Sequence, residues 1–67
     1  MATFPERLKE LRTDKALSQR DLANATGISQ NAIAFWENNK RVPNANAIII
    51  LANYFDVTTD YLLGLED

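Results

Sequence analysis

The stretch Ser18–Glu37, SQRDLANATGISQNAIAFWE, contains the capping and turn residues from which the fold of this 67-residue chain can be predicted. Its serines at 18 and 29 are favoured helix N-caps, because a serine hydroxyl accepts hydrogen bonds from the free N–H groups of a first helical turn. Gly27 lies between them and can take the left-handed conformation that ends a helix. The stretch therefore predicts two short helices, from Ser18 to Gly27 and from Ser29 to about Asn38.

A connection of so few residues makes two helices cross at a steep angle, as in a helix-turn-helix, which we place at about residues 18–38. Ala23 is small where the helices must approach closely, and Gly27 supplies the turn. Ile33 and Trp36 lie three residues apart, on one side of the second helix. We expect these four residues to be structural.

Helix-forming residues dominate the rest of the chain, and no alternation of apolar and polar residues is long enough for a strand. Capping residues and helical spacing of apolar residues predict three further helices, at about Thr3–Lys15, Asn44–Phe55 and Thr58–Leu63. The sequence thus predicts a single all-α domain over residues 1–67, a compact bundle of five helices.

Phe35 and Trp36 are neighbours, and a helix turns by about 100° per residue, so their rings cannot both face one core. A helical wheel places Trp36 inward with Ala32 and Ile33, and Glu37 on the border. The opposite side, called here the outer face, comprises five residues: Gln30, Asn31, Ala34, Phe35 and Asn38.

The composition argues against an enzyme or a metal protein. The chain has no cysteine and no histidine, which removes thiolate ligands, the commonest metal ligand and the commonest general base. No apolar run approaches the roughly 20 residues of a membrane span. We therefore expect no catalytic site, cofactor, metal or membrane contact, and a cytoplasmic location.

The net charge of −2 is unevenly distributed along the chain. Residues 1–42 hold seven basic and five acidic residues, which gives +2, whereas residues 43–67 hold four acidic residues and no basic one, which gives −4. The net charge argues against a polyanionic partner, whereas the basic first part is compatible with one. On charge alone, ordinary surface charge is the favoured explanation.

The sequence resembles the Cro-like helix-turn-helix repressors of phages and bacteria, of the xenobiotic-response-element type. The matching segments keep their spacing over nearly the whole chain and are RLKELR at 7–12, LSQxxLA at 17–23, GIS at 27–29, Ile33, WEN at 36–38, Pro43, LA at 51–52 and VTxDYLLG at 57–64. The resemblance implies the lambda-repressor-like fold. It also implies binding to double-stranded DNA, with the helix from Ser29 in the major groove and the helix from Ser18 across the backbone.

The outer face carries residues suited to base recognition. An amide pairs with the adenine edge, and Gln30 and Asn31 begin their helix, where this docking geometry places base contacts. With Ala34 and Phe35 they form the expected base-contacting set, Phe35 through a thymine methyl. The alternatives are an ordinary polar surface for the two amides and a protein-binding surface for Phe35.

Phosphate contacts are expected from residues around the two helices. Gln19 opens a helix, where backbone N–H groups favour an anion. Asn38, Lys40 and Arg41 follow the other helix, with a solvated loop as the alternative. The resemblance implies a structural ion pair between Arg12 and Glu37, and Arg12 is also a candidate phosphate contact.

So few cations predict weak binding by one copy, and hence a homodimer on half-sites about 34 Å apart. Ile50 lies off the apolar face of its helix and is a candidate dimer or partner contact. The resemblance adds Thr59 and Leu62. The alternative function is a protein-interaction module that keeps the fold without binding DNA, which the net charge, Phe35 and Ile50 favour.

Overall fold

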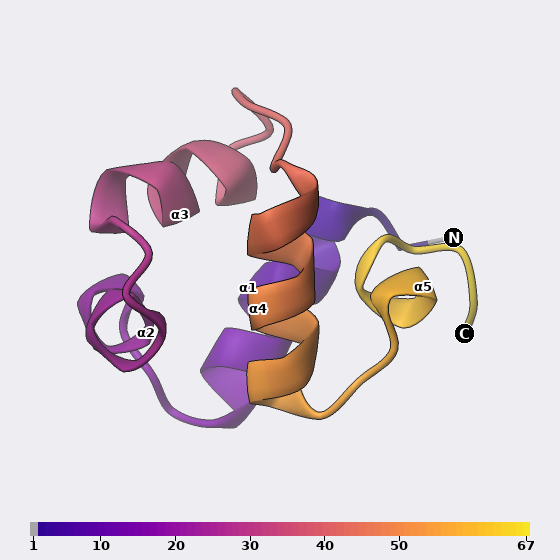
Figure 1. The fold of residues 1–67 in the computed structure, drawn as a ribbon, viewed down its shortest axis with the longest axis horizontal. Helices are drawn as coiled ribbons and strands as arrows, with labels where there is room; N and C mark the ends of the chain where they lie inside the picture. Colours follow the sequence, from indigo (N-terminus) through magenta and orange to yellow (C-terminus); the bar gives the residue numbers. More distant parts are fainter. Residues whose placement is uncertain (1) are drawn as a thin grey trace.

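The computed structural model describes residues 2–67, and over this range the chain forms five α-helices and no strand (Figure 1). The helices are α1 (Phe4–Asp14), α2 (Gln19–Thr26), α3 (Gln30–Glu37), α4 (Ala45–Phe55) and α5 (Thr59–Leu62). The predicted all-α architecture is confirmed, and every helix begins and ends within two residues of its expected bounds.

Side-chain caps explain where four of the helices begin. The side-chain oxygens of the N-caps accept hydrogen bonds from the backbone N–H three residues later, at 3.0 Å for Ser18, 3.1 Å for Ser29, 2.8 Å for Asn44 and 3.0 Å for Thr58. At the start of α1 the Glu6 carboxylate accepts from the Thr3 backbone N–H at 3.0 Å, as a capping box requires.

The turn between α2 and α3 depends on the conformation of Gly27. Its φ is +76°, in the left-handed region, and its N–H donates to the Ala23 carbonyl at 2.9 Å. A Cβ at this position would meet nothing within 4 Å, so backbone conformation and not lack of space calls for glycine. In Figure 1, α2 is seen nearly end-on while α3 runs across the view, so the steep crossing is confirmed.

The core lies between the helices and takes one or more side chains from each of them. Leu8, Leu22, Ile33, Leu51 and Leu62 are its fully buried members. Trp36 packs edge-on against Phe4, with ring centroids 6.2 Å apart, and so ties α3 to the start of α1. Ala23 is half-buried and packs against the same core. The structural roles predicted for Ala23, Ile33 and Trp36 agree with this packing.

The prediction that Leu62 belongs to a dimer or partner surface is wrong. Its side chain is 0% exposed and packs in the core, because the single turn of α5 points this residue at the rest of the bundle. Its neighbour Leu63 is exposed instead. A second copy could reach Leu62 only if α5 were displaced.

The end of the chain is held against α1 by Arg7, whose burial no sequence pattern predicted. Arg7 is 7% exposed, and its guanidinium lies 3.8 Å from the centroid of the Tyr61 ring. It also donates to the Glu66 carbonyl at 3.1 Å.

Within residues 2–67, no helix is both long enough and apolar enough to cross a membrane.

Candidate nucleic-acid interface

Four of the five residues of the outer face are exposed, while the opposite side of α3 packs in the core. Gln30 and Asn31 are exposed in the first turn, and Ala34 is half-buried. Phe35 is 37% exposed, whereas Trp36 is 7% exposed and Ile33 is fully buried. Because the buried side fixes the rotation of the helix, the amides of the first turn are presented in a defined direction.

Arg12 and Glu37 form the ion pair that the resemblance implied, and it joins α1 to α3. Nε of Arg12 donates to Oε2 of Glu37 at 2.7 Å, and Nη2 donates to Oε1 at 2.9 Å. Nη1 of Arg12 donates to the Leu17 carbonyl at 2.7 Å, and Gln19 donates to Glu37 at 3.2 Å. One carboxylate therefore connects the end of α1, the start of α2 and the end of α3.

This network keeps the Arg12 guanidinium charged and largely covered. The hydrogen bonds that Arg12 donates to the Glu37 carboxylate raise the pKa of Arg12, and burial opposes that shift more weakly. The Arg12 side chain is only 11% exposed and that of Glu37 only 4%. A phosphate contact by Arg12 stays a prediction. All three nitrogens of its guanidinium already donate hydrogen bonds within the domain.

The start of α2 already carries a negative charge close to Gln19. The backbone N–H and the hydroxyl of Ser18 lower the pKa of the Asp21 carboxyl, so this group is ionised at neutral pH. Its carboxylate accepts from the Ser18 N–H at 2.9 Å. The expected phosphate contact of Gln19 stays a prediction, and a phosphate there would meet this carboxylate nearby.

The loop after α3 is turned back by a left-handed asparagine. Asn38 ends the helix, Asn39 has a φ of +58°, and its N–H donates to the Trp36 carbonyl at 3.1 Å. The Lys40 N–H then donates to the Phe35 carbonyl at 2.8 Å. These two bonds form a Schellman motif, which directs the following residues back along the helix.

The reversal places Arg41 on the exposed ring of the outer face. Its guanidinium carbon is 4.9 Å from the centroid of the Phe35 ring, within the range of a cation–π contact. The sequence predicted both residues as contacts to DNA but not their contact with each other. The only sequence signal is the asparagine at 39, whose tolerance of left-handed conformations predicts a reversal.

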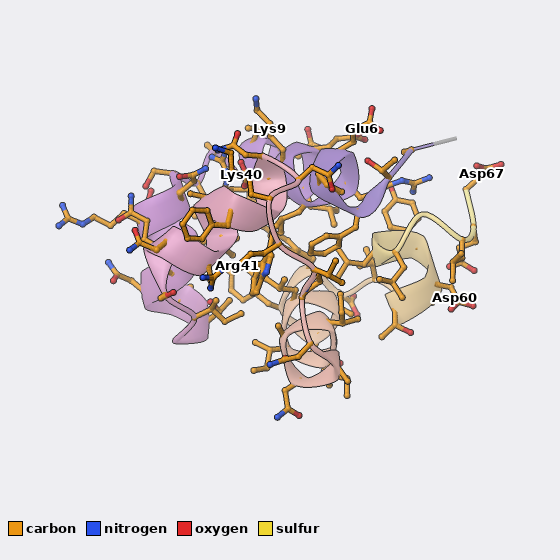
Figure 2. All side chains as sticks on the ribbon, turned by 90° about the horizontal axis from the view of Figure 1, so that it is seen from above. Glu6, Lys9, Lys40, Arg41, Asp60 and Asp67 are labelled. Carbon is orange, nitrogen blue, oxygen red and sulfur yellow. The ribbon has the colours of Figure 1, made fainter. Side chains whose placement is uncertain are left out.

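Two cations after α3 lie far from two acidic residues near the end of the chain. Figure 2 shows Lys40 and Arg41 near α3, and Asp60 and Asp67 at the far end of the molecule, near α5. The asymmetry along the chain is therefore also an asymmetry in space. An anionic partner would be attracted to the α3 end and repelled by the α5 end.

Of the predicted dimer contacts, Ile50 on α4 and Thr59 on α5 are exposed. Ile49 is exposed beside Ile50. An adjacent pair of exposed isoleucines is available for contact with another protein, although isolated apolar residues are common on protein surfaces.

Comparisons with known proteins agree with this geometry. Residues 6–67 match a helix-turn-helix domain family. The chain is 41% identical over 64 residues to the HTH-type transcriptional activator BcrR of Enterococcus faecalis, covering 96% of this chain and 31% of BcrR. It is 34% identical over 62 residues to the HTH-type transcriptional regulator ImmR of Bacillus subtilis, covering 92% of this chain and 49% of ImmR. It is 41% identical over 61 residues to the HTH-type transcriptional regulator AnsR of Bacillus subtilis, covering 91% of this chain and 53% of AnsR.

The chain thus spans between about a third and about half of the length of these relatives. The matched residues include α2, the turn at Gly27 and α3. These elements form the helix-turn-helix, and α3 carries the outer face described above. The chain belongs to the helix-turn-helix domain family, in which it resembles transcriptional regulators.

Proposed function

We propose that this protein is a sequence-specific transcriptional regulator that places α3 in the major groove of double-stranded DNA. The observation that carries the proposal is the outer face of α3, which presents Gln30 and Asn31 from a helix whose other side is locked in the core. Amides in the first turn of such a helix suit the N6 and N7 edge of adenine.

The proposed phosphate contacts at the other end of α3 fit this orientation of the helix; they are Asn38, Lys40 and Arg41. All three are exposed. Two cations per copy release few counterions, so one domain should bind weakly and with a shallow dependence on salt. A homodimer on an inverted repeat doubles the contacts, with half-site centres about 34 Å apart.

Ile50 and Thr59 are the proposed contacts between the two copies. Both are exposed, on α4 and α5, away from the outer face of α3 in sequence and fold. Changing Ile50 to a charged residue would weaken dimer formation while leaving α3 untouched. Leu62 is no longer part of this surface.

Repression is the proposed mode of regulation, since a domain that occupies an operator excludes other proteins without further contacts. The relative BcrR is named an activator. Transcription in vitro from a promoter that overlaps the bound site separates the two modes, because a repressor lowers transcript yield as the site fills.

Gln30→Ala tests the base-contact assignment. The variant should lose about 1–3 kcal/mol of discrimination at the base it contacts, which is roughly a 5- to 150-fold loss of affinity for the preferred site. Affinity for unrelated sequence should not change. Fluorescence anisotropy with preferred and scrambled duplexes measures both.

Asn53→Ala is the matched control, because Asn53 is an exposed amide on α4, outside the outer face. It should bind like wild type. Equal affinity of Gln30→Ala and wild type for every duplex would remove Gln30 from the base contacts.

A protein-interaction module is the second candidate, and the exposed Phe35 on a domain of net charge −2 favours it. A protein-interaction module should show no salt-dependent affinity for DNA. Two results together would support this function: the wild-type domain binds no DNA, and it binds a protein partner that the Phe35→Ala variant no longer binds.

A further inference from the structure

We propose that Phe35 acts on DNA through Arg41, as a platform that holds the guanidinium at the C-terminal end of the outer face. This role replaces a direct contact between Phe35 and a base. The inference rests on the proposed function, and it concerns which atom of this face reaches the DNA. It makes Phe35 a positioning residue for a cationic contact.

The backbone of the loop after α3 brings Arg41 back to the last turn of that helix. The left-handed Asn39 and the bond from the Lys40 N–H to the Phe35 carbonyl, at 2.8 Å, fold the loop over the last turn of α3. The carbonyl that anchors the loop belongs to the same residue whose ring receives the guanidinium.

Arg41 has no other partner among residues 2–67. No hydrogen bond or ion pair of the described chain includes its guanidinium, which lies 4.9 Å from the ring centroid of Phe35. Arg7 and Arg12, by contrast, spend their donors on carbonyl and carboxylate oxygens. A cation–π contact needs no hydrogen bond from the guanidinium, so the N–H groups of Arg41 stay free for bidentate binding to a phosphate or a guanine.

The ring itself is a poor direct contact in this arrangement. Phe35 is 37% exposed, and one of its faces is beside the guanidinium. An arginine loses much rotamer freedom when it binds, so one that is already restrained loses less. The platform thus favours binding without touching DNA.

A double-mutant cycle tests the coupling, with Phe35→Leu, Arg41→Ala and the double variant measured on the preferred duplex. Phe35→Leu should weaken binding about two- to five-fold, the range of an exposed cation–π contact. In the Arg41→Ala background the same change should have no further effect. Arg41→Ala should also reduce the slope of log affinity against log salt by about 1, whereas Phe35→Leu should not.

Lys40→Ala is the matched control, because Lys40 is a cation of the same loop without the ring contact. Phe35→Leu and Lys40→Ala should be additive. Duplexes with deoxyuridine for thymidine test the direct contact, since they lack only the methyl groups. Additivity of Phe35→Leu with Arg41→Ala, or a loss on deoxyuridine that Phe35→Leu abolishes, would overturn the platform in favour of a methyl contact.

The free protein gives a readout that does not depend on DNA. NMR should show the Arg41 side-chain protons shifted upfield by the ring, and Phe35→Leu should remove the shift. Absence of that shift in wild type overturns the inference even if DNA binding holds. If wild type binds no duplex at any salt concentration, the proposed function fails, and the inference fails with it.

Discussion

Trp36→Ala should remove most of the stability of the domain, whereas Phe35→Ala should leave the fold in place. Trp36 is buried against Phe4, and truncation of a core tryptophan costs about 3–5 kcal/mol. A domain of this length has a total stability of roughly 3–10 kcal/mol. The adjacent Phe35 is partly exposed and contacts Arg41, so its loss should cost about 1 kcal/mol or less.

Urea denaturation followed by far-UV circular dichroism compares the two variants. The Trp36→Ala midpoint should fall steeply or the variant should be unfolded without urea, and the Phe35→Ala midpoint should stay close to that of wild type. Equal destabilisation by the two changes would contradict the assignment of one ring to the core and the other to the surface.

Arg12→Met should destabilise the domain by about 3–5 kcal/mol, although the ion pair itself adds little net stability. Methionine fills much of the same space but leaves Glu37, whose side chain is 4% exposed, as a covered carboxylate without its cation. The Leu17 carbonyl loses its donor as well. Arg20→Met is the matched control, because Arg20 is exposed on α2, and its stability should be near wild type.

The double variant Arg12→Met, Glu37→Leu separates the cost of an unpaired charge from the value of the pair. It should recover a large part of the stability lost by Arg12→Met, because no charge is left buried. The free energies of unfolding of wild type, both single variants and the double variant complete the cycle. A double variant as unstable as the sum of the two single variants would show that the charges act independently.

The sequence predicted the features that depend on residues close along the chain. The N-caps at Ser18 and Ser29 and the left-handed Gly27 are local, so their consequences are visible without a structure. The division of α3 into Trp36 inward and Phe35 outward follows from helical geometry alone. The Arg12–Glu37 pair came from the family resemblance and not from spacing, because the two residues are on different helices.

Features that join distant segments could not be predicted in this way. The burial of Arg7 depends on Tyr61, which lies near the other end of the chain, so no local pattern predicts it. Leu62 was expected on a partner surface, and the direction of the single turn of α5 depends on packing against the rest of the bundle. At the site, the contact of Arg41 with Phe35 depends on the course of an irregular loop.

Selection of bound duplexes from a random DNA pool, repeated at two salt concentrations, tests whether α3 recognises a DNA sequence. We expect an enriched inverted repeat with half-site centres about 34 Å apart, and affinity that falls as salt rises because condensed counterions are released. An enriched sequence that Gln30→Ala no longer distinguishes from its competitors would place α3 at the bases. No enriched sequence and no dependence on salt would rule out a sequence-specific DNA-binding domain and favour a domain that binds protein.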